Sequence, residues 1–573
     1  MRTIRISLAQ MNPTVGDLKG NRDKIIDCIK RARNLGSDIV AFPELALTGY
    51  PPEDLVLKPQ FVKDNLRILK EIIKAARGIT AVVGFVDSRE HIHNSAAVIH
   101  NGKLAHVYHK MLLPNYGVFD EYRYFKPGKR YPIIAIKGVN IGVNICEDIW
   151  YADGPARTQS LAGAEVILNI NGSPYHKGKG WERQQMLALR AQENNVYVVY
   201  ANMVGGQDEL VFDGHSMVLN PRGRLIASGK QFEEDLLTCD LKLPGPYEPV
   251  DLSSEQILDE HRDFIDAIEL SNRPAKDRKP LPPTRSVKPY PMCEEVYHAL
   301  VLGTRDYVKK TGFKSVVIGL SGGIDSSLVA AIAVSAIGRN NVNGVFMPSQ
   351  YSSDQSREDA AQLADSLGIK MLTIPIHQPY HAYLNTLRQA FAHTKQDVTE
   401  ENLQARTRGN ILMALSNKFG WLVLTTGNKS EMSTGYATLY GDMAGGFAVI
   451  KDVPKTMVYE ICKCINRLAG TTIIPKRVLT KAPTAELRPN QKDSDSLPIY
   501  PLLDPILKAY VEDDKEFEEM LKMGFDRKTV ERVIRLVDTS EYKRRQAPPG
   551  VKITPRSLGK DRRFPITNRY KSF

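Results

Sequence analysis

The chain has 573 residues, of which 42% are hydrophobic and 25% are charged, as is ordinary for a soluble globular protein. One hydrophobic core does not support that length, so a single small domain is excluded. Six scattered cysteines exclude a disulfide framework and favour a reducing compartment, and no apolar signal segment or membrane span is seen. We therefore expect a cytoplasmic protein with no membrane partner.

The net charge of +12 suits ligands that carry several negative charges. Part of that charge lies in the C-terminal tail, at 543–545 and near Arg562. No motif that interleaves aromatic residues with these charges accompanies the tail. We expect the tail to be solvated or to contact another subunit of a homo-oligomer, and we expect no nucleic acid partner, with RNA binding as the alternative.

Strands and helices alternate from Thr3 to about Leu243. The Asn101-Gly102 pair predicts the turn of a hairpin over 95–110, and a helix is expected from Trp181 to Asn194. The other expected strands are 3–10, 37–45, 80–87, 139–150, 165–173 and 196–205, and a further helix is expected at 21–36. This order is typical of a mixed two-sheet α/β layering rather than of one doubly wound sheet.

Three polar residues follow the expected strands of this half: Glu44, Lys110 and Cys146. Ends of neighbouring strands can converge in space. A thiol is activated by a nearby base and cation, and an ammonium group can stabilise the oxyanion of a tetrahedral intermediate. Taken singly, Cys146 has the alternative of a small core residue and Lys110 that of a surface charge.

The stretches F-P-E-L-A-L-T-G-Y, Y-H-K-M-L-L-P-N-Y-G-V-F-D-E and N-I-C-E-D-I-W contain these three residues. Together they resemble the nitrilase/amidase superfamily with its Glu–Lys–Cys triad. The resemblance implies that Glu44 is the general base, Lys110 the oxyanion stabiliser and Cys146 the acyl-carrying nucleophile. It also implies an orienting role for Glu121.

A proline-rich, basic stretch at 272–291 predicts an extended connector, and the segment 252–271 before it is expected to be helical. We therefore expect a first domain at 1–245, a linker at 246–290 and a second domain at 291–573.

The second half is organised around Lys314–Ser327, KSVVIGLSGGIDSS, in which a β-branched strand, a glycine turn and a helix start follow one another. This geometry presents free backbone N–H groups to phosphate. It is not a Walker A loop, and it resembles instead the pyrophosphate loop of the N-type ATP pyrophosphatases. Asp325 would need a bridging Mg²⁺ beside a phosphate. The alternative is an ordinary tight turn.

Further strands and helices alternate through 342–428, which predicts a parallel Rossmann-like sheet with ligands at the carboxyl ends of its strands. The expected fold is thus α/β, with an N-terminal nitrilase-like αββα sandwich and a C-terminal Rossmann-like parallel sheet of the adenine nucleotide alpha hydrolase type.

The loop, E-N-L-Q-A-R-T-R-G-N from Glu401, K-S-E-M-S-T-G-Y-A-T-L-Y-G-D-M and K-A-P-T-A-E-L resemble NAD synthetases, and the nitrilase-like half indicates their glutamine-dependent form. The resemblance implies ATP and Mg²⁺ as co-substrate and metal, and small-molecule partners. The implied ATP contacts are Gly319, Leu320, Ser321, Gly322, Gly323, Ile324, Asp325, Ser326 and Thr426. The implied metal ligands are Asp325 and Glu431. The implied deamido-NAD contacts are Asn402, Glu431 and Lys543, with Arg406 and Lys455 as weaker candidates. The implied glutamine contacts are Tyr116, Glu147, Ser173 and Lys179.

Three alternatives remain open. The first is a similar two-part enzyme that amidates another acid, as in guanylate and asparagine synthetases. The second is a tRNA-modifying enzyme with a pyrophosphate loop, for which the second half offers only Cys293 and the pair Cys462 and Cys464. The third is a nitrilase-like scaffold with a vestigial triad, against which the intact Glu44, Lys110 and Cys146 speak.

Overall fold

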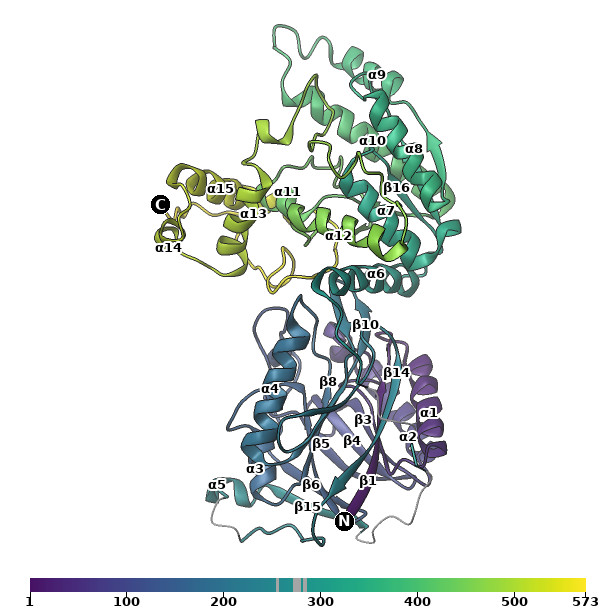
Figure 1. Ribbon diagram of the computed structural model, residues 1–573, viewed down its shortest axis with the longest axis vertical. Coiled ribbons are helices and arrows are strands. Elements are labelled where there is room, and N and C mark those ends of the chain that lie inside the picture. The colour runs from purple at the N-terminus through teal and green to yellow at the C-terminus, as the bar shows by residue number, and fades with distance from the viewer. Residues whose placement is uncertain (254–256, 272–279, 282–285) are drawn as a thin grey trace. The chain divides into compact units, whose positions relative to one another are not determined.

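A computed structural model describes residues 1–253, 257–271, 280–281 and 286–573. The chain forms two compact units, which we describe separately (Figure 1). Unit 1 comprises Met1–Gln207 and Phe212–Pro289, and unit 2 comprises Asp208–Val211 and Tyr290–Phe573. Four residues from within the first half of the sequence thus belong to the second unit.

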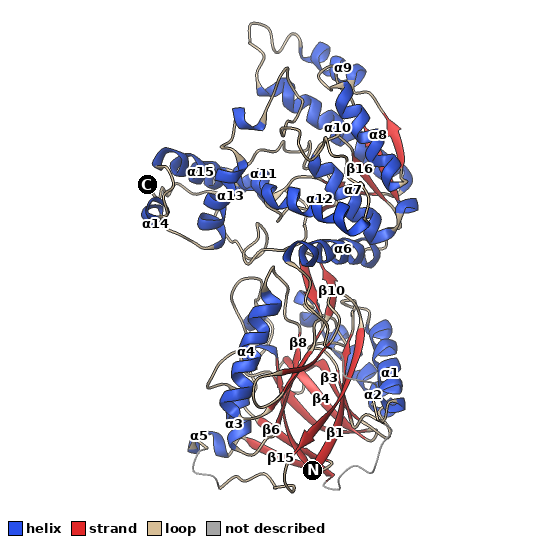
Figure 2. Cartoon of the chain, viewed as in Figure 1, coloured by secondary structure: helices blue, strands red, loops and turns tan. Residues whose placement is uncertain are grey.

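Unit 1 contains two mixed sheets, which are drawn in red in Figure 2. The first has the order β14-β1-β2-β3-β4-β5, with bounds Asp235–Leu243, Arg2–Gln10, Ile39–Ala41, Thr80–Asp87, His93–His100 and Lys103–His109. The second has the order β13-β12-β9-β8-β7-β6-β15, with bounds Leu225–Ser228, Met217–Leu219, Tyr197–Asn202, Val166–Asn171, Val139–Ile145, Tyr131–Ile136 and Ile265–Ser271. A two-stranded ribbon joins β10 (Val204–Gln207) to β11 (Leu210–Asp213).

Apolar side chains of the two sheets meet in one core, to which Ile6 and Val143 belong. The outer face of the first sheet packs against α1 (Leu18–Asn34) and α2 (Pro59–Ala75), and the second packs against α3 (Pro155–Leu161) and α4 (Lys179–Asn194). The layers are therefore helix, sheet, sheet and helix, as expected. Asn101 and Gly102 both have positive φ, 48° and 78°, which confirms the predicted hairpin turn.

The expected helix over 252–271 is wrong. The described part holds only the short α5 (Asp259–Arg262), and Ile265–Ser271 forms β15, which pairs in parallel with β6. Its side chains alternate between more and less buried positions, as in a strand. Most of the proline-rich stretch 272–291 lies outside the described residues.

Unit 2 is built on an all-parallel sheet of order β18-β17-β16-β19-β20, with bounds Lys370–Thr373, Val342–Phe346, Val316–Gly319, Leu422–Thr425 and Phe447–Ala448. Its helices are α6 Met292–Lys310, α7 Ile324–Ile337, α8 Asp354–Leu367, α9 His377–Leu387, α10 Val398–Phe419, α11 Lys429–Thr434, α12 Lys455–Ala469, α13 Tyr500–Leu507, α14 Phe517–Lys522, α15 Arg527–Thr539 and α16 Glu541–Arg544. The predicted strand, glycine loop and helix at 314–337 are confirmed as β16 and α7.

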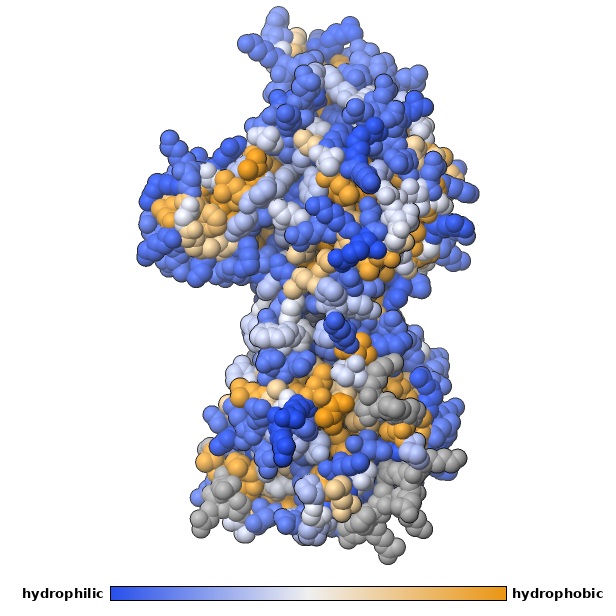
Figure 3. Space-filling model, in the orientation of Figure 1, coloured by the Kyte–Doolittle hydropathy of each residue, from blue (hydrophilic) through white to orange (hydrophobic). Residues whose placement is uncertain are grey.

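A space-filling view shows hydrophilic side chains interrupting the apolar patches of the visible face (Figure 3). In the described part of the chain, every helix is either too short or too polar to cross a membrane.

Candidate active sites

In unit 1 the three triad candidates follow strands of both sheets. Lys110 comes directly after β5 in the first sheet, and Cys146 comes directly after β7 in the second. Glu44 lies three residues beyond β2. All three side chains are buried. Cys146 has φ 46°, a left-handed conformation that is unusual for a residue with a side chain and that is often found at functional turns.

Lys110 lies between two buried carboxylates. Its Nζ is 2.7 Å from Glu44 Oε1 and 2.9 Å from Glu121 Oε1. Burial alone would lower the pKa of Lys110, but the charges of Glu121 and Glu44 hold it well above its usual value. Burial raises the pKa of Glu121 to about 7, against the opposing effect of Lys110. The lysine is therefore a fixed cation, and Glu121 titrates near neutral pH.

Glu44 is held in place from both sides. Asn94 Nδ2 donates to its Oε1 at 2.7 Å, and the backbone N–H of Gly172 donates to its Oε2 at 2.8 Å. Burial and then the charge of Glu44 raise the pKa of the Cys146 thiol, while Lys110 opposes this shift. The thiol is therefore protonated at rest and needs a base at the moment it attacks, a role that suits Glu44.

Of the four glutamine candidates, two contact each other and two have other partners. Tyr116 donates its hydroxyl to Glu147 Oε1 at 2.9 Å. Ser173 is buried and accepts a hydrogen bond from Arg183 Nη2 at 3.4 Å. Lys179 lies over the Trp150 ring, with its Nζ 4.2 Å from the centroid. Burial lowers the pKa of Lys179, and the charges of Glu182 and Glu147 oppose the shift.

Two further buried carboxylates escaped sequence reasoning. Asp148 accepts hydrogen bonds from the Tyr108 hydroxyl at 2.7 Å and from the backbone N–H groups of Leu112 and Ile145 at 2.8 and 3.0 Å. It thereby ties the chain after β5 to the end of β7, the two points that carry Lys110 and Cys146. The motif N-I-C-E-D did contain it, directly after Glu147.

The second is Asp213, whose partner Arg183 is completely buried, with Nη2 3.1 Å from Asp213 Oδ1. Arg183 lies one helical turn after Lys179 in α4, on the same face. This four-residue spacing from Lys179 is the sequence signal by which Arg183 could have been found.

In unit 2 a cavity of about 290 Å³ lies over the loop between β16 and α7. All eight predicted loop residues and Thr426 line it: Gly319, Leu320, Ser321, Gly322, Gly323, Ile324, Asp325, Ser326 and Thr426. Gly322 has φ 74°, and a Cβ there would lie 2.3 Å from the backbone oxygen of Ser356, so only glycine fits. The hydroxyls of Ser321 and Ser326 are 3.1 Å apart, at the start of α7. The loop therefore has the features of a phosphate cradle.

The two candidate metal ligands also line this cavity, and a lysine lies between them. Lys455 Nζ is 2.5 Å from Asp325 Oδ2 and 3.1 Å from Glu431 Oε1. Burial raises the pKa of Glu431 to about 8, although Lys455 opposes the shift. From the sequence, Lys455 is only a weaker candidate for contacting deamido-NAD. Nothing in the sequence shows that Lys455 and Asp325, which are 130 positions apart, meet.

Arg408 was not singled out, yet it lines the cavity, where its Nε donates to the Met347 carbonyl at 3.0 Å. Burial lowers its pKa to about 10, so it stays a cation at neutral pH. The sequence signal for Arg408 was its position in the stretch R-T-R-G, directly before the buried Gly409.

Asn402 and Lys543 do not line the cavity. Asn402 Oδ1 accepts from the Thr438 hydroxyl at 2.8 Å, and Lys543 Nζ donates to the carbonyls of Gly435 and Ala437 at 2.8 Å each. They hold the loop 435–438, which carries cavity residues. Arg406 is exposed and donates to the Leu439 carbonyl.

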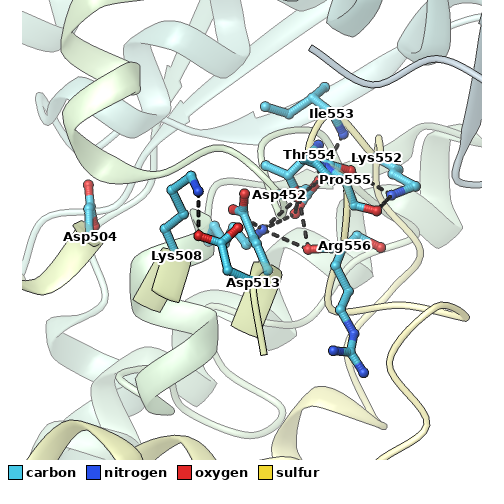
Figure 4. A network of polar contacts seen from close by, with 12 residues as sticks. Asp452, Asp504, Lys508, Asp513, Lys552, Ile553, Thr554, Pro555 and Arg556 are labelled. Atoms are coloured by element: carbon cyan, nitrogen blue, oxygen red, sulfur yellow. Dashed lines mark hydrogen bonds and ion pairs between the residues drawn. The ribbon is translucent and has the colours of Figure 1, made fainter. Parts of the chain in front are cut away.

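A buried polar network holds the start of α11, two residues before Glu431. Lys429 Nζ is 2.9 Å from Asp452 Oδ1, 2.7 Å from Glu512 Oε1 and 2.6 Å from Thr554 Oγ1. Asp452 in turn accepts from the backbone N–H groups of Ile553 and Thr554 at 2.8 and 2.7 Å. Figure 4 shows Ile553 and Thr554 next to Asp452, with their contacts as dashed lines. The C-terminal segment therefore anchors the helix that carries Glu431.

Comparisons with known proteins match both units. A carbon-nitrogen hydrolase model matches residues 5–246, and an NAD synthase model matches residues 296–547. A protein of Thermotoga maritima called glutamine-dependent NAD(+) synthetase is 52% identical over the full length of both chains, and one of Aquifex aeolicus with the same name is 47% identical over 99% of this chain and all of its own. A solved structure of glutamine-dependent NAD+ synthetase from Acinetobacter baumannii in complex with ADP covers both chains completely, with 41% identity and a TM-score of 0.75.

Fold and sites thus define a carbon-nitrogen hydrolase joined to an NAD synthase in one chain. The full-length matches are more specific than the two domain models. The chain belongs to the family of glutamine-dependent NAD(+) synthetases.

Proposed function

We propose that the chain makes NAD from deamido-NAD and ATP with ammonia that unit 1 releases from glutamine. One observation carries this proposal: full-length similarity to glutamine-dependent NAD(+) synthetases in a chain that keeps both the Glu44–Lys110–Cys146 cluster and the phosphate loop. The proposed domains are 1–245 and 291–573, with 246–290 as the linker.

Catalysis in unit 1 begins at Cys146. Glu44 accepts the thiol proton as the sulfur attacks the side-chain amide carbon of glutamine, and Lys110 stabilises the oxyanion that forms. Ammonia leaves, and a water molecule deprotonated by Glu44 hydrolyses the thioester to glutamate. Glu121 also accepts a hydrogen bond from Lys110 and so helps to orient it.

Glutamine has an ammonium and a carboxylate group besides its amide. Glu147, oriented by Tyr116, has the charge that binds the ammonium group, and Lys179 has the charge that binds the carboxylate. Ser173, held by Arg183, is the proposed hydrogen-bonding partner nearest the amide.

In unit 2 the nicotinate carboxylate attacks the α-phosphate of ATP, which gives an acyl adenylate and pyrophosphate. The loop from Gly319 to Ser326 holds the departing pyrophosphate, and Arg408 and Lys455 add positive charge to the cavity. Ammonia then attacks the acyl carbon, and AMP leaves. Asn402 and Lys543 are proposed to contact deamido-NAD together with the loop that they hold.

Asp325 and Glu431 fit a Mg²⁺ ion. Both accept a hydrogen bond from Lys455 Nζ, so the two carboxylates lie close together, and Mg²⁺ takes one or two carboxylates together with phosphate oxygens and water. Among the described residues no cluster of three or more metal-binding side chains exists, so the ion would depend on the phosphates of ATP. When bound, it would offset negative charge on the transferring group.

The test measures NAD formation from deamido-NAD, ATP and Mg²⁺, with either glutamine or ammonium as nitrogen source. We expect Cys146→Ala to abolish the use of glutamine and to keep the use of ammonium, and Asp325→Ala to abolish both. Cys28→Ala, at a half-buried thiol in α1, is the matched control and should keep both. Loss of both activities in a folded Cys146→Ala would contradict the proposed division of labour.

Three further points are proposals: a route that keeps ammonia from being protonated, a homo-oligomeric state and a cytoplasmic location. Sedimentation at several protein concentrations tests the second. Competition of ¹⁵N-ammonium with unlabelled glutamine tests the first, because a sequestered route excludes the label from NAD.

A further inference from the structure

Two thiols of unit 2 lie in contact. Cys293 is in the first turn of α6, and Cys464 is near the end of α12. Their Sγ atoms are 3.1 Å apart. The two helices pack on each other and lie side by side in Figures 1 and 2. A disulfide bond is about 2.05 Å long, so a shift of about 1 Å would join the two sulfur atoms.

The two thiols differ in access. Cys293 is partly exposed, whereas Cys464 is only 2% exposed. Burial and the contact with Cys293 raise the pKa of Cys464 to about 12, so it keeps its proton. Cys462, two positions earlier, is completely buried and packs in the core.

The guanidinium of Arg467 contacts both sulfur atoms. Arg467 Nη2 lies 3.4 Å from Cys293 Sγ and 3.3 Å from Cys464 Sγ, and it also pairs with Glu294 at 3.2 Å. A neighbouring guanidinium favours the thiolate form of a cysteine, which is the reactive form. The accessible thiol therefore has both a guanidinium and a second thiol in contact with its sulfur atom.

We propose that Cys293 and Cys464 are a reversible oxidation site, at which peroxides convert the pair into a disulfide that links α6 to α12. The Cys293 thiolate attacks one peroxide oxygen, the O–O bond breaks, and the departing hydroxide takes up a proton and leaves as water. The Cys464 sulfur then loses its proton as it attacks the sulfur of the resulting sulfenic acid. The S–O bond breaks, the S–S bond forms, and the Cys464 proton leaves with the oxygen as a second water molecule.

The bond would restrain a long part of unit 2. The two cysteines are 171 positions apart, and the segment between them contains the phosphate loop and Glu431. Closing so long a loop restricts the unfolded chain and so stabilises the folded one. Lys455, at the other end of α12, is nine residues away, or about 14 Å along the helix axis, so the bond would form away from the reacting groups.

The experiment uses the full-length reduced chain. It is treated with hydrogen peroxide under native conditions, free thiols are alkylated, and peptides are identified by mass spectrometry. We expect a linked Cys293–Cys464 peptide that dithiothreitol removes. We also expect the thermal midpoint of unit 2 to rise by several degrees on oxidation in the parent and in Cys28→Ser, but not in Cys464→Ser.

Arg467→Gln tests the role of the cation. This substitution should slow formation of the linked peptide several-fold, and Arg467→Lys should restore most of the rate. The proposal is overturned if Cys293 oxidises to sulfinic or sulfonic acid without linking to Cys464, or if the linked peptide forms only after unfolding. If Arg467→Gln forms the linked peptide as fast as the parent does, the guanidinium has no role in the proposed oxidation.

Discussion

Lys455 gives the sharpest test of the site in unit 2, because its Nζ separates two carboxylates that would otherwise repel each other. Lys455 is 2% exposed, and Asp325 and Glu431 are 16% and 17% exposed, so solvent screens the group little. Removing one member of a buried ion pair costs about 3–5 kcal/mol, because the partner charge stays buried. We therefore expect Lys455→Met to destabilise unit 2 by about that amount.

The same substitution should act on catalysis. Without the lysine, nothing opposes the burial that already raises the pKa of Glu431 to about 8, so this carboxylate becomes harder to ionise and holds a cation less well. Loss of one preorganised charge typically lowers turnover about 10²–10³-fold. Ammonium-dependent NAD formation, followed over a series of Mg²⁺ concentrations, should fall by that factor and need more Mg²⁺.

The controls separate charge from folding. Lys463→Met removes an exposed lysine from the same helix and should change neither stability nor turnover. Adding Glu431→Gln to Lys455→Met rebalances the charge, so it should restore part of the stability and none of the activity. A Lys455→Met variant with the melting temperature, turnover and Mg²⁺ dependence of the parent would refute the reasoning.

Three further results are expected. Glu121 has a folded pKa of about 7, above its unfolded value, so the folded state keeps a proton that the unfolded chain loses. Stability of unit 1 should therefore fall by about 3 kcal/mol as the pH rises from 4.5 to 7, and denaturant unfolding of Glu121→Gln should show a smaller fall. Asp148→Asn should lower the glutaminase kcat about tenfold or more with a smaller change in KM, measured as glutamate release, because a weaker acceptor then holds the chain that carries the triad. Lys429→Met should lower the thermal midpoint of unit 2, and adding Glu512→Gln should recover part of the loss, whereas additive effects would contradict a direct pairing.

The elements that bear chemistry were predictable where one local stretch specifies them. The strand, glycine loop and helix around Asp325 have a local pattern that only a few structures satisfy, and the hairpin at Asn101 has a turn that needs two positive φ angles. The seven residues of β15 fit both a strand and an amphipathic helix, and pairing with β6, which is remote in sequence, decides between them. That explains why the helix expected there was wrong.

Within the sites, the sequence supplied the charged residues but not the distances between them. Glu44 and Lys110 were paired through a family resemblance, and the structure places them 2.7 Å apart. The contact of Lys455 with Asp325 joins different elements, and no periodicity within one element indicates it. Arg183 looked like an ordinary charge on a helix until its burial against Asp213 was known.

The four residues 208–211 make the folding of unit 2 depend on a stretch encoded far upstream of it. The backbone N–H of Lys552 donates to the carbonyl of Glu209 at 2.8 Å, and the Cα of Gly303 is covered by Val211 and Val551. A gene fragment that starts at Tyr290 would lack both partners, leaving one amide without its acceptor and a gap over α6. Shortening the protein to its NAD synthase half therefore requires grafting a replacement for that small loop, and a simple truncation would yield an incomplete core.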